Sequence, residues 1–141
     1  MQIRRYWVTL LILLCSSGES LAAELFESAS TPQPNSKMDI VIKEVDRRER
    51  SSILDLKITN IGSSVGSSFF IVCSISRLAQ IRGDYRYVVK LDQTPKQGQM
   101  TIGFLRSATE DPAALGRGFE NLGTKDVLDL EQFAPICSNF K

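Results

Sequence analysis

The sequence contains no histidine. Histidine is the commonest general base near neutral pH, a frequent ligand of transition metals and the usual pH switch of proteins. Its absence excludes Ser-His-Asp and Cys-His catalytic sites. We therefore expect a protein without enzymatic activity, and the sequence predicts no catalytic residue, no cofactor and no metal site.

The chain also lacks an excess of charge of either sign. It has 17 Lys and Arg residues against 16 Asp and Glu residues, which gives a formal net charge of +1. Proteins that hold nucleic acid or an anionic membrane surface usually carry a clear basic excess. The sequence therefore predicts no nucleic-acid partner.

Cysteine is scarce, with three residues in the chain. Cys15 falls in the export signal described below, which leaves Cys73 and Cys137 as an even pair. In an oxidising compartment such a pair favours a disulfide. The alternative is a buried Cys73 and a free thiol at Cys137. We predict the Cys73–Cys137 bridge.

The one pronounced apolar run, residues 6–15, is too short to cross a bilayer as a helix, which takes roughly 20 residues. It follows Arg4 and Arg5 and precedes the small residues Ala22 and Ala23. This order is typical of a cleaved signal peptide. We interpret residues 1–23 as that signal and the protein as periplasmic or secreted. The alternative membrane contact is a lipid on Cys15, which would tether the protein.

Residues 24–37 are polar and contain Pro32 and Pro34, so we predict a flexible linker there. Residues 38–45 and 53–60 read as the two strands of a hairpin. In the second of them Leu54, Leu56 and Ile58 alternate with polar residues. Strict alternation is typical of a strand with one buried face and one solvated face.

A helix is predicted over residues 67–82, which contain neither proline nor glycine and stop at Gly83. Ile75 and Leu78 lie on its apolar face, and Ser74 is expected on the polar face. Gly83 is expected to be the left-handed residue that ends the helix. The opening residues 69–72 would also suit a strand, and the length of the segment decides for a helix.

A second hairpin is predicted from residues 85–91 and 100–105. Tyr87, Val89 and Leu91 are expected to face the core, and Arg86 and Lys90 to point away from it. After residue 105 the chain is irregular: residues 111–116 suggest a short helical turn, and residues 126–133 suit either an edge strand or a last helix. The clustered carboxylates of this region, at positions 110, 111, 126 and 129, lack the spacing of a calcium loop and read as solvated charge.

The resulting fold class is α+β in the order ββαββ. An antiparallel sheet of two hairpins carries one amphipathic helix and an irregular C-terminal region. Residues 38–141 are expected to form a single small domain. Arg77, Arg82, Arg86 and Lys90 form a candidate docking patch, because the end of the helix leads directly into the strand. The alternative for these four is ordinary interspersed surface charge.

For function, the sequence favours a small exported bacterial protein that binds an unknown protein or envelope partner through its solvated sheet face or its loops. One alternative is a small periplasmic enzyme or small-ligand-binding domain, with a pocket between helix and sheet lined by aromatic residues (Phe69, Phe70, Tyr85, Tyr87 and Phe104). Another is a membrane-tethered spacer domain. The sequence names neither a substrate nor a partner.

Overall fold

The computed structural model describes residues 23–30 and 37–140. Except for Ala23, the predicted signal peptide lies outside these residues. The strands are β1 (Glu27–Ala29), β2 (Asp39–Arg47), β3 (Ser51–Asn60), β4 (Tyr87–Asp92), β5 (Gln99–Leu105) and β6 (Leu128–Asp129). The helices are α1 (Ser64–Gly83) and α2 (Ala134–Cys137), with short 3-10 turns η1 (Pro112–Leu115), η2 (Thr124–Asp126) and η3 (Leu130–Phe133).

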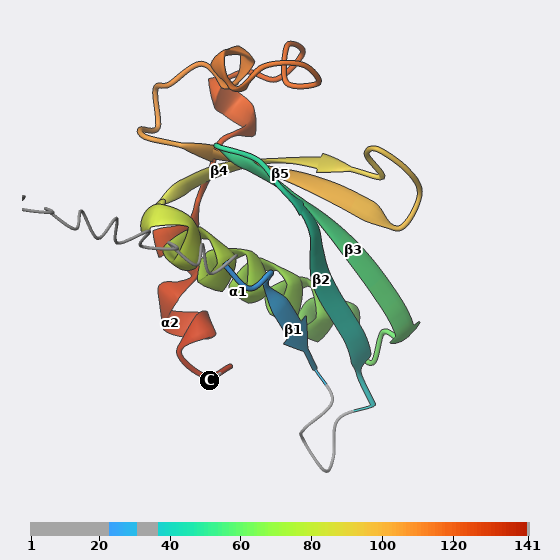
Figure 1. Ribbon diagram of the computed structural model, residues 1–141. Coiled ribbons are helices and arrows are strands. Elements are labelled where there is room, and N and C mark those ends of the chain that lie inside the picture. The colour runs from blue at the N-terminus through green and yellow to red at the C-terminus, as the bar shows by residue number, and fades with distance from the viewer. Residues whose placement is uncertain (1–22, 31–36, 141) are drawn as a thin grey trace, which may run out of the picture.

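The fold is α+β, as the sequence predicted. Six antiparallel strands form one sheet in the order β1-β2-β3-β5-β4-β6, and α1 lies across one of its faces (Figure 1). The two predicted hairpins are β2–β3 and β4–β5, and they join through β3 and β5. In that pairing Ser51 lies opposite Gly103 and Leu54 opposite Met100. The additional strands β1 and β6 occupy the two edges of the sheet.

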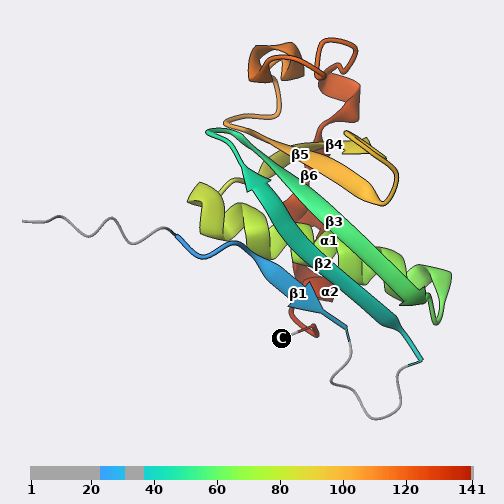
Figure 2. The same ribbon diagram turned by 45° about the vertical axis from the view of Figure 1, so that its right-hand side comes forward.

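Part of the predicted linker is a strand. Glu27–Ala29 pairs with β2 as its outer neighbour, and Figure 2 shows β1 running beside β2. Phe26 is buried in the core, and the hydroxyl of Ser74 donates to that of Ser28 at 3.0 Å. The buried side chain of Phe26 and the hydrogen bond between Ser74 and Ser28 therefore hold this polar segment against the rest of the fold. Residues 31–36 of the predicted linker lie outside the described part of the chain.

Helix α1 is longer than predicted, and it ends differently. It begins after Ser63, whose side chain accepts a hydrogen bond from the Gly66 N–H at 3.0 Å, as expected of a serine cap. The left-handed residue at its other end is Asp84, with φ of 53°, and not Gly83 as expected. Ser74 is buried because it faces β1, which corrects its expected place on the polar face.

The main core lies between α1 and the sheet. Its helix residues include Phe70, Ile75, Leu78 and Ala79, and its sheet residues include Ile40, Ile42, Leu54, Met100, Ile102 and Phe104. By length and composition α1 is also apolar enough to cross a membrane. Core helices meet the same criterion, and the packing of α1 on the sheet shows that it is the core helix of this fold.

The opposite face of the sheet carries a second, smaller core, which corrects the prediction for β4. Val89, Leu105 and Phe119 are buried there, with Tyr87 and Leu91 packed against them. Val88 points the other way, into the main core. Both faces of β4 are therefore covered, because residues 106–127 fold over the face that α1 leaves open. Arg86 and Lys90 lie on the same side as Val88, the side of α1.

Gly103 on β5 is the point of closest approach between the sheet and this covering segment. A Cβ atom at this position would lie 2.5 Å from a methyl carbon of Leu115 and 2.8 Å from a ring carbon of Phe119. Only glycine leaves room for these side chains. The segment is thereby seated directly on the sheet, next to the β2–β3 turn.

Candidate functional site

The predicted disulfide is present in the structure. Cys73 on α1 and Cys137 on α2 are bonded, with their Cα atoms 5.2 Å apart. The bridge fastens the C-terminal region to the middle of the core helix. A disulfide of this kind is compatible with an oxidising, extracytoplasmic compartment.

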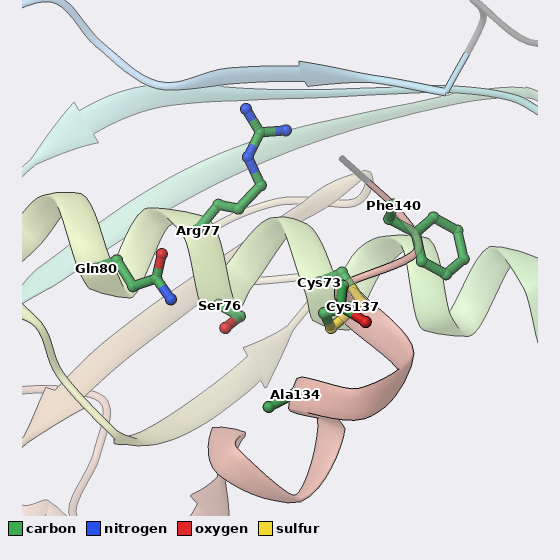
Figure 3. A pocket seen from close by; sticks show the side chains of 8 residues that line it. Cys73, Ser76, Arg77, Gln80, Ala134, Cys137 and Phe140 are labelled. Atoms are coloured by element: carbon green, nitrogen blue, oxygen red, sulfur yellow. A yellow bond between two sulfur atoms is a disulfide. The ribbon is translucent and has the colours of Figure 1, made fainter.

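A surface pocket of about 560 Å³ lies beside the bridge, between α1 and α2. It is lined by Cys73, Ser76, Arg77, Gln80, Ala134, Cys137, Ser138 and Phe140. Figure 3 shows Ser76 and Gln80 on the side of α1 that faces α2, whereas Arg77 extends away toward the sheet. Its guanidinium lies 5.9 Å from the centre of the Phe26 ring. This pocket therefore presents hydroxyl and amide groups, with the charge of Arg77 directed elsewhere.

The four residues of the candidate docking patch have separate environments. Arg86 is held by two carboxylates, those of Asp129 at 2.8 Å and Glu131 at 2.6 Å. Lys90 pairs with Asp92 at 2.9 Å, and Arg77 lies over Phe26. Arg82 is buried, with 7% of its side chain exposed, so it is not part of a surface. A docking role for the other three stays a prediction.

Arg82 belongs instead to a buried polar cluster around Glu44 on β2, whose side chain is fully buried. The Glu44 carboxylate accepts hydrogen bonds from the Ser52 hydroxyl at 2.6 Å, from Arg47 Nε at 3.0 Å and from the Phe26 N–H at 3.0 Å. Arg82 Nη1 lies 3.5 Å from Glu44 Oε1 and donates to the Ser52 hydroxyl. The cluster thus joins β1, β2, β3 and α1.

Arg82 also holds the β2–β3 turn from the side of α1. Its guanidinium donates to the carbonyl oxygens of Ser51 and Glu49, both at 3.1 Å, and to that of Arg48. It lies over the ring of Phe104, 5.0 Å from the ring centre. Carbonyl groups at a turn are good acceptors for the fixed fork of guanidinium donors. The turn is therefore fixed to the end of the helix.

Burial and hydrogen bonding act in opposite directions on the charges of this cluster. Burial by itself raises the pKa of Glu44, but hydrogen bonds from Arg47, Ser52 and Phe26 outweigh it and hold that pKa below its usual value. Burial lowers the pKa of Arg82, against the opposing effect of Glu44. The carboxylate is thus kept charged because its oxygens are satisfied by donors.

A second ion pair holds the same turn from the opposite side. Arg50 Nη1 and Nη2 donate to the two carboxylate oxygens of Glu110, each at 2.7 Å, and Nη2 also donates to the Phe104 carbonyl at 2.9 Å. The Arg106 N–H donates to Glu110 at 2.6 Å. The hydrogen bond from Arg50, followed by that from Arg106, holds the pKa of Glu110 below its usual value. Glu110 is therefore a partly buried ion-pair partner and not the solvated charge expected from the sequence.

Between the turn and the segment over β5 lies a second pocket, of about 410 Å³, which we call the arginine pocket. Its lining residues are Arg48, Glu49, Arg50, Ser51, Arg106, Ala114, Leu115, Arg117 and Phe119. Figures 1 and 2 both show the β2–β3 turn beside the start of the orange segment that follows β5. The pocket therefore gathers four arginines from three separate parts of the chain.

Two of the four arginines already have carboxylate partners. Arg48 pairs with Asp46 at 3.0 Å on the exposed surface, and Arg50 pairs with Glu110 at 2.7 Å. Arg106 and Arg117 make no ion pair with any residue that the structure describes, and neither does Glu49. The pocket thus offers two guanidinium groups and one carboxylate without an ion-pair partner in the described residues.

Sequence reasoning missed this pocket. The residues of the turn read as an ordinary charged turn, and Arg106 and Arg117 lie in a region without a clear pattern. Their convergence depends on the pairing of Ser51 with Gly103, which brings the turn next to the end of β5. The one available signal was the density of arginine in residues 47–50.

The site contains no recognisable metal centre. Within residues 23–30 and 37–140, no group of three or more Cys, Asp or Glu residues is placed to hold a metal ion.

Comparison of the chain with models of known protein families, with curated proteins and with solved structures gives no match. The fold and the site therefore define a disulfide-bonded α+β domain with an arginine-lined pocket.

Proposed function

We propose that this is a non-enzymatic binding protein, exported to the periplasm or secreted, which recognises a partner or envelope component through an anionic group held in the arginine pocket. The absence of histidine supports a binding role over catalysis. The N-terminal pattern of residues 1–23 and the Cys73–Cys137 bridge support export. The loops at this end of the sheet, and not its solvated face, are the proposed contact surface.

The observation that carries the proposal is the pair Arg106 and Arg117. Both line one pocket, and neither guanidinium forms an ion pair with a described residue, although Arg106 lies close enough to Glu110 to interact with its charge. A guanidinium group presents donors in a planar fork that matches a carboxylate or a phosphate. Guanidinium groups that line a concave surface and form no ion pair of their own are available to fix such an anion.

The pocket is also held in shape without a ligand. Arg82 bonds the backbone of the turn from one side, and the Arg50–Glu110 pair holds it from the other. Gly103 seats Leu115 and Phe119 on the sheet. A preformed site loses little conformational freedom on binding, and this increases affinity.

The test is a titration of the ¹⁵N-labelled protein with acetate and with inorganic phosphate, followed by NMR. We expect chemical-shift changes at the side-chain Nε–H groups of Arg106 and Arg117 and at the backbone amides around the pocket. Arg117→Gln should abolish these changes. Arg77→Gln, which removes an arginine that does not line this pocket, is the matched control and should preserve them. Shifts spread over other surfaces, or no shifts at all, would contradict the proposal.

A further inference from the structure

We infer that the anionic group bound in the arginine pocket belongs to a small zwitterion, an α-amino acid with an apolar side chain. This inference rests on the proposed function, since it names the ligand class of the same site. It is carried by a third residue, Glu49, which lines the pocket together with Arg106 and Arg117.

Glu49 supplies the complement to an ammonium group. Its side chain is exposed and makes no ion pair in the described part of the chain. It lies next to Arg50, yet both terminal nitrogens of Arg50 donate to Glu110 on the other side. A site with two guanidinium groups and one carboxylate that form no ion pair among the described residues matches a ligand that carries a carboxylate and an ammonium group close together.

The backbone of Glu49 is fixed in place. Its carbonyl oxygen accepts a hydrogen bond from Arg82 Nη2 at 3.1 Å, and the adjacent carbonyl of Arg48 accepts from the same nitrogen. Because Arg82 is buried at the end of α1, the turn cannot swing away without disturbing the core. The main chain of Glu49 is therefore held in place at the edge of the pocket, and its exposed carboxylate extends from that fixed point.

The charge balance argues against a polyanion as the ligand. The four arginines of the pocket lie near three carboxylates: those of Asp46, Glu49 and Glu110. A single positive charge is left over. Nucleic acids and other polyanions bind through many phosphate contacts and need a larger excess, whereas one net positive charge suffices for a small ligand with a single carboxylate.

The pocket is lined mostly by polar residues, and its aliphatic residues Ala114 and Leu115 are the part of the lining that favours an amino acid with an apolar side chain. The volume of about 410 Å³ lies toward the lower end of the range of roughly 300–1,000 Å³ that is usual for ligand sites. Ala114 and Leu115 of η1 form part of the wall and are at least partly exposed. An aliphatic side chain packed against them would lose its contact with water, which favours binding.

The experiment compares three ligands by calorimetry on the intact, disulfide-bonded protein. L-leucine carries both charges, N-acetyl-L-leucine lacks the ammonium group, and L-leucinamide lacks the carboxylate. We expect L-leucine to bind, and each of the other two to bind about tenfold more weakly or worse, because each lacks one of the two charged groups that hydrogen-bond in the pocket.

Two variants test which residues of the pocket recognise the ammonium group and the carboxylate of L-leucine. Glu49→Gln should weaken L-leucine about tenfold and leave N-acetyl-L-leucine unchanged, whereas Arg117→Gln should weaken both. Arg77→Gln is again the control, and thermal melts confirm that each variant is folded. A retained fold is expected for Glu49→Gln because the side chain is exposed.

The outcomes separate this inference from the proposed function. If N-acetyl-L-leucine binds as tightly as L-leucine, or if Glu49→Gln does not change the affinity for L-leucine, the inference of a zwitterionic ligand is wrong. The proposed anion-binding site is then still supported. If phosphate or acetate shifts the arginines but L-leucine does not bind, the same conclusion holds. If none of these probes binds, the proposed function falls together with the inference.

Discussion

Nη1 of Arg82, near the end of α1, lies 3.5 Å from Oε1 of Glu44 on β2, and solvent reaches almost none of either side chain. This contact connects the core helix with the β2–β3 hairpin, whose turn forms one wall of the arginine pocket. The stability of the fold and the shape of the candidate site therefore depend on the same buried cluster.

The first prediction concerns this cluster. Arg82→Ala removes a donor from a buried carboxylate and from three turn carbonyls, and we expect it to lower the free energy of unfolding by about 3 kcal/mol. Arg86→Ala, which removes an exposed arginine paired with Asp129, is the control and should cost far less. Urea unfolding measures both. Equal losses would show that the buried cluster contributes no more than a surface ion pair.

The second prediction is the loss of stability in acid. Hydrogen bonds hold the pKa values of Glu44 and Glu110 below the usual 4.5. A carboxylate whose pKa is lower in the folded state stabilises the fold at pH values above its unfolded pKa, and that contribution is lost as the pH falls through the folded pKa. We therefore expect the free energy of unfolding to decrease as the pH drops below about 4.5.

The Glu44→Gln and Glu110→Gln variants test this assignment. Each should be less stable than the wild type at neutral pH and should lose less stability on acidification. Urea unfolding measured over a series of pH values gives the slope for each protein. An acid slope that neither substitution changes would assign the pH dependence to other carboxylates.

The third prediction concerns the disulfide. The bridge closes a loop of 64 residues, and loss of its constraint on the unfolded chain should cost about 4 kcal/mol. Cys137→Ser should therefore lower the melting temperature to about that of the reduced wild type. Reductant should have no effect on the variant. A wild-type melt that does not respond to reductant would show that the bridge contributes no stability.

The fourth prediction concerns the close approach at Gly103. Gly103→Ala places a methyl group within 3.0 Å of Leu115, Phe119 and Val89, and overpacking of this kind costs about 1–3 kcal/mol. Because Leu115 and Phe119 also line the arginine pocket, the same variant should weaken anion binding.

Gly123→Ala is the matched control for this substitution. Nothing lies within 4 Å of a Cβ atom at position 123, so the variant should keep both the stability and the binding of the wild type. Thermal melts and the phosphate titration measure the two properties. If Gly103→Ala behaves like Gly123→Ala, the segment is not seated on the sheet as described.

The local elements could be predicted from the sequence because their signals are local. Alternation placed β3, and the hairpin pattern placed β2, β4 and β5, to within a few residues of their observed bounds; the length of the segment after Gly66 indicated α1. The disulfide followed from an even count of two cysteines. The short turn η1 followed from Asp111 before Pro112, and the side chain of Asp111 does accept from the Ala113 N–H.

The faces of β4 and the strand β1 could not be predicted in the same way. Val88 and Val89 are both buried because two different segments cover the two faces of β4. β1 forms because Phe26 finds a place in the core and Ser28 finds a buried partner in Ser74. In each case the deciding contact comes from residues far away in the chain.

The sequence by itself determined the two hairpins, most of the core helix and the pair of cysteines, since hydrophobic periodicity acts over a few residues. The tertiary structure alone decided which arginines are buried, which are paired and which remain free. Arg82 lies in the core because Glu44 is 38 positions away in the chain but adjacent in space. Arg106 and Arg117 share a pocket with the β2–β3 turn because β3 pairs with β5 and the segment after β5 folds back over Gly103. Charge pairing depends on spatial proximity, and only the packed sheet and helix create it.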